Sequence, residues 1–396
     1  MISGDCDSRF TKVADVFRRA INSGHELGAT LAIEYDGQMV VNLWGGHRDR
    51  HRKHVWAEDT IVNVFSVTKG VVAICTARLV EEGKLDLEQT VAHYWPEYGC
   101  EGKGATTVME LLCHRGAMHG FRESILADRW QDWDFFTKLL ERQSPFGVPG
   151  AKQSYHALTF GWLVGELIKR VDGRSVGNYF RDEVATPLHL DFKIGLDVSD
   201  MARCADKVMS TTPNTLLGID FIRYLPDLLL PKTLKNIKDA LCSGDFYVAF
   251  PPNLDPATII NSDSWRLAEI PSANGHGTAA SLATLYGIIC NGGKRNGFRL
   301  LAPETINLAT KIHSNGPDTV LFGLPFKFGL GFMVDSPTTP ISHAKRRFGH
   351  SGIGGETAFG DLKNGVGFAF LSNQQHRPKE LFKTVNQLAR AFYRLL

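Results

Sequence analysis

The sequence has 396 residues, a formal net charge of +2, 43% hydrophobic residues and 22% charged residues, which are ordinary values for a soluble globular protein. A net charge this close to zero argues against a general nucleic-acid binder, which would carry a marked basic excess. The seven cysteines are scattered and none forms a CxxC pair, so a disulfide framework and a zinc site are both disfavoured.

The first residues, MISGDCDSRF, lack the basic stretch followed by an apolar stretch that marks a signal peptide. No run reaches the ~18 uninterrupted apolar residues of a membrane span. We therefore expect a cytoplasmic protein with no membrane partner, which also argues against an exported cell-wall enzyme. A homo-oligomer stays open, because the sequence does not reveal the oligomeric state.

The chain begins with a helix and a hairpin. Residues 8–22 carry the amphipathic periodicity of a helix, with apolar side chains near one face. Two β-rich runs then flank Asp36-Gly37, which is a strong signal for a two-residue hairpin turn. The next segment, HRDRHRKH at 47–54, is a charged loop.

The middle of the chain is mainly helical, and strands return near its end. Helical patterns cover residues 107–119, 128–142, 156–188, 232–242, 277–292 and 378–396, with an irregular connector at 210–231. The β-rich runs are 327–335, 356–362 and 365–373, and Lys363-Asn364-Gly365 is the turn between the last two.

This order of elements predicts an α+β (α/β) fold with two regions. Residues 1–62 and 271–396 would form an antiparallel sheet flanked by helices, and residues 63–270 would form an inserted, mainly helical region. We expect the active site in the groove between the two regions.

Ser66 and Lys69 begin a segment, 66–82, that is apolar nearly all round and is followed by Gly83 as a C-cap. Such a helix is buried. Residues three apart share a helix face, and burial lowers the pKa of a lysine, which can then take the proton of a serine hydroxyl. The pair predicts a nucleophilic serine. The alternative is a capping serine beside a surface lysine, and the same spacing recurs in a polar loop at Ser342–Lys345, where we attribute it to chance.

Two further segments could complete a site around Ser66. Tyr155 precedes a strongly apolar helix, and a phenolate beside a lysine ammonium can relay protons; a core tyrosine is the alternative interpretation. The sequence GHSGIGG at 349–355 precedes a strand, and its glycines would let a strand edge approach a ligand. A backbone N–H after this turn could pair with that of Ser66 to hold an oxyanion, although a flexible glycine turn would look the same.

These three segments, in this order, resemble the serine β-lactamase and DD-peptidase superfamily. FSVTKG matches the SxxK motif, Tyr155-His156-Ala157 falls at the Tyr-x-Asn position, and His350-Ser351-Gly352 falls at the Lys-Thr-Gly position. The flanking sequences are similar to the esterase branch, the family VIII carboxylesterases, along almost the whole chain. They are WGGHRDR, GKLDLEQTVAHYWPEY, VMELLCHRGAMHG, YHALTFGWLVGELIKRVDGRSV and RRFGHSGIGGETAFGDLKNGVGFAFLSN.

The resemblance implies a β-lactamase/transpeptidase-like fold and an acyl-enzyme mechanism that needs no metal or cofactor. Ser66 would attack the carbonyl of a small carboxylic ester with a short acyl chain. Lys69 and Tyr155 would share the general-base and general-acid roles. The backbone N–H groups of Ser66 and Ile353 would form the oxyanion hole, and water would then hydrolyse the acyl-enzyme.

The sequence departs from the β-lactamase pattern at two positions. Ala157 replaces an asparagine, which removes a polar contact, and His350 replaces a lysine. A mostly neutral imidazole would hold the carboxylate of a penicillin less well than an ammonium group does. With Ser351 and Gly352, His350 would contact the substrate. Both departures favour neutral esters over β-lactams.

Other functional assignments fit the sequence less well than a serine hydrolase centred on Ser66. An α/β-hydrolase with Ser351 as nucleophile is disfavoured, because Ile353 stands where GxSxG requires glycine. A metal site at His47, His51 and His54 is disfavoured by the surrounding positive charge. We expect His114 to be structural, hydrogen-bonded within its loop.

The sequence leaves three alternatives to a carboxylesterase open. A β-lactamase or DD-peptidase-type amide hydrolase would use the same nucleophile. An esterase of this kind could also have weak β-lactamase activity. An acyltransferase would discharge the same acyl-enzyme with an alcohol or amine instead of water. A binding scaffold on a hydrolase fold would usually have lost Ser66, Lys69 or Tyr155, all of which are present.

Overall fold

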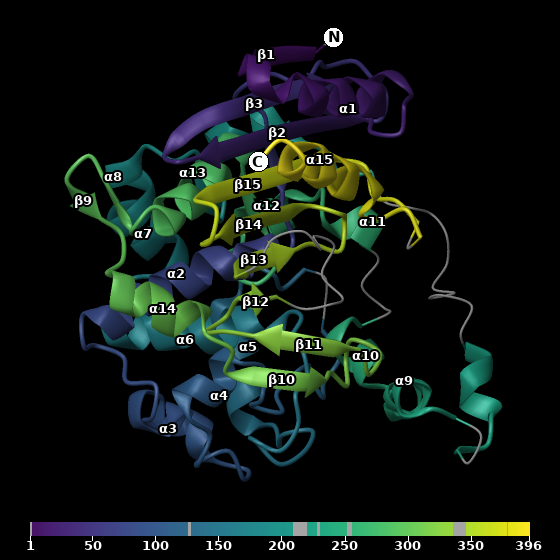
Figure 1. Cartoon of the computed structure of the whole chain (residues 1–396). Helices are drawn as coiled ribbons and strands as arrows, with labels where there is room; N and C mark the ends of the chain where they lie inside the picture. Colours follow the sequence, from purple (N-terminus) through teal and green to yellow (C-terminus); the bar gives the residue numbers. More distant parts are fainter. Residues whose placement is uncertain are drawn as a thin grey trace.

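A nine-stranded antiparallel sheet built from both ends of the chain dominates the computed structural model (Figure 1). The structure describes residues 2–125, 128–208, 220–227, 230–251, 256–335, 346–377 and 379–396. In spatial order the strands are β1 (Ile2–Cys6), β3 (Gln38–Gly46), β2 (Gly28–Tyr35), β15 (Val366–Ser372), β14 (Thr357–Asp361), β13 (Arg347–Ser351), β12 (Met333–Val334), β11 (Pro325–Phe328) and β10 (Ser314–Pro317).

Helices cover both faces of this sheet. The first and last helices, α1 (Thr11–Asn22) and α15 (Lys383–Tyr393), pack together on one face, and α13 (Ala279–Cys290) packs on the other (Figure 1). Side chains alternate between the faces along a strand. Accordingly, Leu31 of β2 joins the apolar cluster of α1 and α15, whereas Ala32 joins the cluster that contains α13.

The inserted part of the chain is mainly helical. Its helices, together with the later α14, are α2 (Val67–Glu81), α3 (Val91–Tyr94), α4 (Val108–Leu112), α5 (Trp133–Arg142), α6 (Thr159–Asp172), α7 (Val176–Phe180), α8 (Thr186–Leu188), α9 (Lys232–Ser243), α10 (Asp245–Ala249), α11 (Pro256–Ile259), α12 (Asp263–Leu267) and α14 (Pro303–Thr310). Short 3-10 or π segments are η1 (Ser8–Phe10), η2 (Pro96–Gly99), η3 (Arg181–Ala185), η4 (Val198–Arg203) and η5 (Asp220–Tyr224). None of the described helices is both long and apolar enough to cross a membrane.

A small second sheet joins the two parts of the chain. Its strands, in spatial order, are β5 (Phe192–Ile194), β7 (Gly275–Gly277), β4 (Ile61–Asn63) and β6 (Cys204–Ala205). A separate two-residue hairpin is formed by β8 (Lys294–Arg295) and β9 (Phe298–Arg299). Because β4 ends three residues before Ser66, this small sheet fixes where α2 begins.

The predicted core helix is confirmed. Every residue of α2 from Val67 to Ala77 is buried, and Gly83, just past its end, has a left-handed φ of +69° as a C-terminal cap requires. The α+β fold of the β-lactamase type is likewise confirmed, as is the hairpin between β2 and β3. The main sheet takes its strands from residues 2–46 and 314–372, while the division at residues 62/63 and 270/271 stays a prediction.

Several elements differ from the sequence-based expectation. The helix predicted over 107–119 ends at Leu112, because His114 and Ala117 adopt left-handed φ values of +60° and +52°. The strand predicted over 327–335 is split into β11 and β12 around Gly331, whose φ is +80°. The small sheet was not predicted, since its strands of two or three residues carry no readable periodicity. β1 was missed because this five-residue edge strand is mostly exposed and has no alternating apolar pattern. Much of the connector 210–231 and the second SxxK spacing, Ser342–Lys345, lie outside the described residues.

Candidate active site

Ser66 lies at the N-cap of α2 and is held there by the segment before it. Val64 donates its backbone N–H to the carbonyl of Gly275 in β7 at 2.9 Å. Phe65 then takes a left-handed φ of +47°, a conformation that costs a non-glycine residue about 1–3 kcal/mol. This strained turn ends β4 and starts the helix, so Ser66 is the first side chain of α2 and stays partly exposed.

Lys69 is fully buried one turn into α2, directly below Ser66. Its Nζ lies 3.2 Å from Ser66 Oγ. The same Nζ donates to the backbone carbonyls of Ala157 at 2.7 Å and of Ser272 at 2.9 Å. None of the ion pairs in the described part of the chain involves Lys69, so its charge has no carboxylate to balance it.

Tyr155 contacts the same serine from the other side. Its hydroxyl lies 2.9 Å from Ser66 Oγ, and the Lys69 ammonium lies 4.9 Å from the centre of its ring. Ser66 Oγ therefore lies within hydrogen-bond distance of both side chains that the sequence predicted beside it. The structure brings the three predicted residues together.

The charge states of this trio follow from burial. Burial holds the pKa of Lys69 well below its usual range, which favours the neutral amine. Burial also raises the pKa of Tyr155, so this side chain is a phenol and not the phenolate that the sequence suggested. A neutral Lys69 can direct two N–H groups to the carbonyls of Ala157 and Ser272 and its lone pair to the hydroxyl of Ser66.

The third predicted segment lies on β13, beside Tyr155. His350 is 2% exposed, and its ring centre is 5.9 Å from that of Tyr155. Its Nδ1 is 3.0 Å from the carbonyl of Ser351, which places the hydrogen on Nδ1. Burial, with the nearby Lys69 adding to it, lowers the pKa of His350 to about 3. His350 is therefore a neutral imidazole, as the sequence predicted.

The glycine turn after β13 packs against the residues that precede Ser66. A Cβ at Gly352 would lie 2.9 Å from the carbonyl oxygen of Val64 and 3.2 Å from Cβ of Phe65, so only glycine fits there. Gly352 uses its own N–H in a 2.7 Å bond to the carbonyl of Glu356. Within the described residues, by contrast, the N–H groups of Ser66 and Ile353 donate to no protein group. These are the two N–H groups that the family resemblance implies for the oxyanion hole.

Sequence reasoning missed the residue that anchors Tyr155. Asp318 is fully buried, and its Oδ1 accepts the backbone N–H groups of Tyr155, Val320 and Leu321, each at 3.0 Å. No local pattern signals this role, because Asp318 is 163 positions from Tyr155. Ser272, whose carbonyl accepts from Lys69, was missed for the same reason.

His114 supports the tyrosine segment, as expected of a structural histidine. Its Nδ1 accepts the backbone N–H of His156 at 3.1 Å, and its backbone carbonyl accepts that of Ser154 at 2.9 Å. Burial lowers the pKa of His114 well below its usual range, so it is a neutral acceptor. His156 is buried too, and its Nε2 accepts the N–H of Met118 at 3.1 Å.

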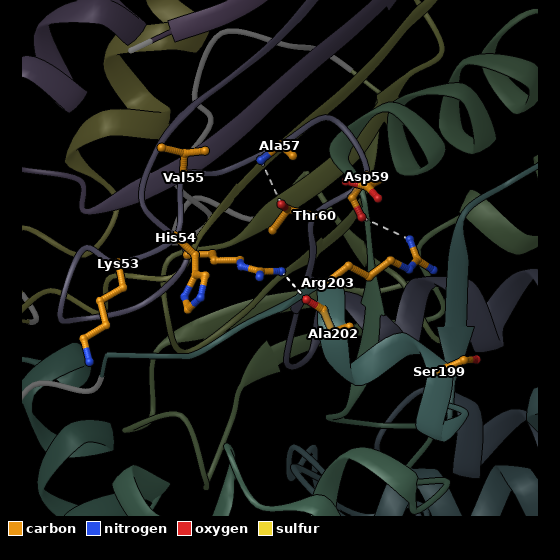
Figure 2. A pocket seen from close by; sticks show the side chains of 10 residues that line it. Lys53, His54, Val55, Ala57, Asp59, Thr60, Ser199, Ala202 and Arg203 are labelled. Atoms are coloured by element: carbon orange, nitrogen blue, oxygen red, sulfur yellow. Dashed lines mark hydrogen bonds between the residues drawn. The ribbon is translucent and has the colours of Figure 1, made fainter.

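The charged loop 47–54 lines a separate pocket of about 600 Å³. Figure 2 shows Lys53 and His54 on one side of it and Ala202 and Arg203 on the other. His54 pairs with Asp49 at 3.2 Å and does not converge with His47 and His51 on a metal-ligand group in the described residues. None of the residues that line this pocket belongs to the site around Ser66.

One group of potential metal ligands occurs in the described part of the chain. His25, Glu26 and His376 bring three ligand atoms within 4.8 Å of one another. Both carboxylate oxygens of Glu26 already accept hydroxyl groups, from Thr384 and Ser372, at 2.6 Å each. The rings of His25 and His376 stack face to face, with their centres 4.1 Å apart. These contacts are typical of a packed polar cluster.

Comparisons with known proteins agree with this geometry. The Beta-lactamase family matches residues 13–391. The "Esterase/beta-lactamase LipL" of Mycobacterium tuberculosis is 33% identical over 383 residues, which are 95% of this chain and 84% of that protein. A penicillin-binding protein homologue from Caulobacter crescentus is 36% identical with a TM-score of 0.87, and a family VIII carboxylesterase is 33% identical with a TM-score of 0.86; both cover 100% of each chain. The chain therefore belongs to the Beta-lactamase family, and its resemblance to the esterase branch is confirmed.

Proposed function

We propose that this protein is a serine carboxylesterase that hydrolyses small, short-chain carboxylic esters through an acyl-enzyme on Ser66. One observation carries the proposal. Ser66 Oγ lies 3.2 Å from a fully buried lysine amine that pairs with no carboxylate of the described residues, and 2.9 Å from a buried phenol. A base with a lowered pKa beside a hydroxyl is the arrangement that activates a serine nucleophile.

Acylation begins with proton transfer from Ser66 to the neutral amine of Lys69 as Oγ attacks the ester carbonyl. The C–O bond to the alcohol then breaks, and the departing alkoxide takes a proton from the phenol of Tyr155, which Lys69 can resupply. The N–H groups of Ser66 and Ile353 would hold the oxyanion of the tetrahedral intermediate. Ser66 also begins a helix, whose positive end favours developing negative charge.

Deacylation reverses these roles. A water molecule gives a proton to the neutral amine of Lys69 and attacks the acyl carbon, and Ser66 leaves as the alcohol with a proton from Tyr155, which Lys69 then resupplies. The balance is one ester and one water consumed, with one carboxylic acid and one alcohol released. An alcohol or amine in place of water would give acyl transfer with the same residues.

Two features favour a neutral ester over a β-lactam. His350 is neutral where the β-lactamase pattern carries a lysine, so it offers no cation to a substrate carboxylate. Ala157 replaces an asparagine side chain and contributes its backbone carbonyl to Lys69 instead. The similar structure whose title names a family VIII carboxylesterase supports the same choice, whereas the name of LipL includes both esterase and beta-lactamase. We also propose that the protein acts in the cytoplasm and that its partner is a small ester.

The test compares wild-type protein with Ser66→Ala on p-nitrophenyl esters of graded chain length and on a chromogenic cephalosporin. We expect ester turnover in the wild type alone, greatest for short chains. A serine-reactive phosphonate should add one adduct by intact mass, and Ser66→Ala should lose it. Fast cephalosporin turnover would instead indicate a β-lactamase, and near wild-type ester turnover in Ser66→Ala would contradict the proposal. Added alcohol acceptors separate hydrolysis from acyl transfer by their products.

A further inference from the structure

Glu356 and Lys207 form a buried ion pair beside the turn that carries Ile353. The two side chains are 0% and 1% exposed. Lys207 Nζ donates to a carboxylate oxygen of Glu356 and, at 2.6 Å, to the backbone carbonyl of Ser372 in β15. The same ammonium lies 5.0 Å from the ring centre of Phe65, the residue before the proposed nucleophile.

The carboxylate of Glu356 fills the inside of the glycine turn. A Cβ at Gly352 would lie 2.6 Å from Glu356 Oε2, and a Cβ at Gly354 would overlap the same carboxylate. The turn closes through the bond from Gly352 N–H to the carbonyl of Glu356. Glu356 therefore sets the path of the backbone on both sides of Ile353.

The ion pair also links this turn to the start of α2. Gly352 packs on the backbone of Val64 and on Phe65, and Lys207 covers the ring of Phe65. Lys207 therefore contacts both sides: it pairs with Glu356 inside the glycine turn and covers Phe65 in the segment before Ser66. A buried ion pair adds little net stability compared with apolar residues of the same size, so its directional geometry is the better explanation for its presence here.

We infer that Glu356 and Lys207 are positioning residues, which hold the Ile353 N–H in register with the Ser66 N–H so that both can meet one oxyanion. The inference rests on the proposed function. It assigns Lys207 a second effect as well. A lone carboxylate at Glu356 would repel the developing oxyanion, and the ammonium of Lys207 cancels that charge.

The charged surroundings of the pair are few. Glu26, which accepts a hydrogen bond from Ser372 and contacts His376, is the acidic neighbour of Lys207. His276 on β7 is the basic neighbour, and burial keeps it neutral by lowering its pKa to about 3. Neither can replace Lys207 as the direct partner of Glu356.

The experiment compares Lys207→Met, the double variant Lys207→Met/Glu356→Gln, and the control Arg295→Met. The control breaks another ion pair to a buried carboxylate, Arg295–Glu34, which joins β8 to β2 away from Ser66. We expect kcat of Lys207→Met to fall by about 10²-fold with KM nearly unchanged, because oxyanion contacts act in the transition state. The double variant carries no unpaired carboxylate, so it should regain part of kcat.

Gly354→Ala supplies an independent variant that keeps both charges but pushes a methyl group into the carboxylate. It should also lower kcat. Amide hydrogen exchange at residues 352–355 should speed up in Lys207→Met and Gly354→Ala but not in Arg295→Met, and thermal unfolding verifies that each variant folds. Equal kcat losses in Lys207→Met and Arg295→Met, or no recovery of kcat in the double variant, would overturn the inference while Ser66 stays the nucleophile. Turnover that survives Ser66→Ala would overturn the proposed function itself, whatever the exchange data.

Discussion

The backbone carbonyl of Ala157 accepts a hydrogen bond from Lys69 Nζ at 2.7 Å, although 88 positions separate the two residues. Because Ala157 lies two residues after Tyr155, this bond joins the proposed base to the segment that carries the proposed acid. The carbonyl of Ser272 takes a second N–H of the same amine. Because two of the hydrogen-bonding positions of Lys69 Nζ are taken by carbonyls, the remaining position faces Ser66 Oγ.

Removal of either partner of Ser66 should slow turnover without unfolding the protein. We expect Lys69→Ala and Tyr155→Phe each to lower kcat by roughly 10²-fold or more, since each removes a proton donor or acceptor. Tyr155→Phe should unfold at nearly the wild-type temperature, because the hydroxyl bonds Ser66 alone among the described residues. Steady-state kinetics with thermal melts test this, and a Tyr155→Phe variant with wild-type kcat would remove Tyr155 from the mechanism.

The pH dependence of activity should follow Lys69. Burial lowers its pKa, and the neutral amine is the form that accepts the proton of Ser66. Wild-type kcat/KM should therefore rise with pH through one ionisation that lies well below the ordinary pKa of lysine, and then stay level. Tyr155 should not end this plateau at mildly alkaline pH, because burial raises its pKa. A rate that only begins to rise near pH 10 would contradict the assignment of Lys69 as base.

The same lysine should leave a signature in stability. Its pKa is lowered in the folded state relative to the unfolded chain, so the unfolded chain binds the extra proton at every pH between the two values. The free energy of unfolding then rises with pH through that window, by up to about 1.4 kcal/mol per pH unit. The rise ends once the pH exceeds the pKa of the lysine in the unfolded chain. Lys69→Met should reduce this slope and leave the part that comes from Lys207, whose pKa burial also lowers, to about 7. Urea unfolding of both proteins between pH 7 and 10 measures it, and parallel curves would contradict the prediction.

The sequence predicts the parts of this site that lie in local patterns and misses those that depend on distant backbone. Ser66 and Lys69 were predictable because an all-apolar helix places them on one buried face, and His350 because a glycine turn follows its strand. Asp318 and the carbonyl of Ser272 act through contacts between remote segments, which no periodicity encodes. The ends of the predicted helices were wrong for a similar reason, since tertiary packing holds His114 in a left-handed conformation.

Asp318 offers a test of the anchoring of Tyr155. Asp318→Ala leaves three backbone N–H groups, two of them buried, without their acceptor and should lower the free energy of unfolding by about 2 kcal/mol. It should lower kcat as well, because the N–H of Tyr155 is one of the three. Asp318→Asn keeps an oxygen at Oδ1 and should behave almost like wild type in both measurements. Equal effects of the two substitutions would show that the charge of Asp318, and not its acceptor oxygen, is what matters.

His350 decides how the site treats a substrate carboxylate. The side chain is neutral, buried and beside Tyr155, so a negatively charged substrate gains no ion pair there. His350→Lys would place an ammonium on the same strand, and a charge-assisted hydrogen bond is worth about 1.5–3 kcal/mol. We therefore expect the ratio of cephalosporin to ester turnover to rise roughly tenfold or more. The new cation should also lower the thermal stability, because the position is buried and burial disfavours a charged ammonium. His350→Gln keeps the site neutral and is the control. An unchanged ratio in His350→Lys, with acylation by esters intact, would mean that the preference for neutral substrates is set elsewhere in the site.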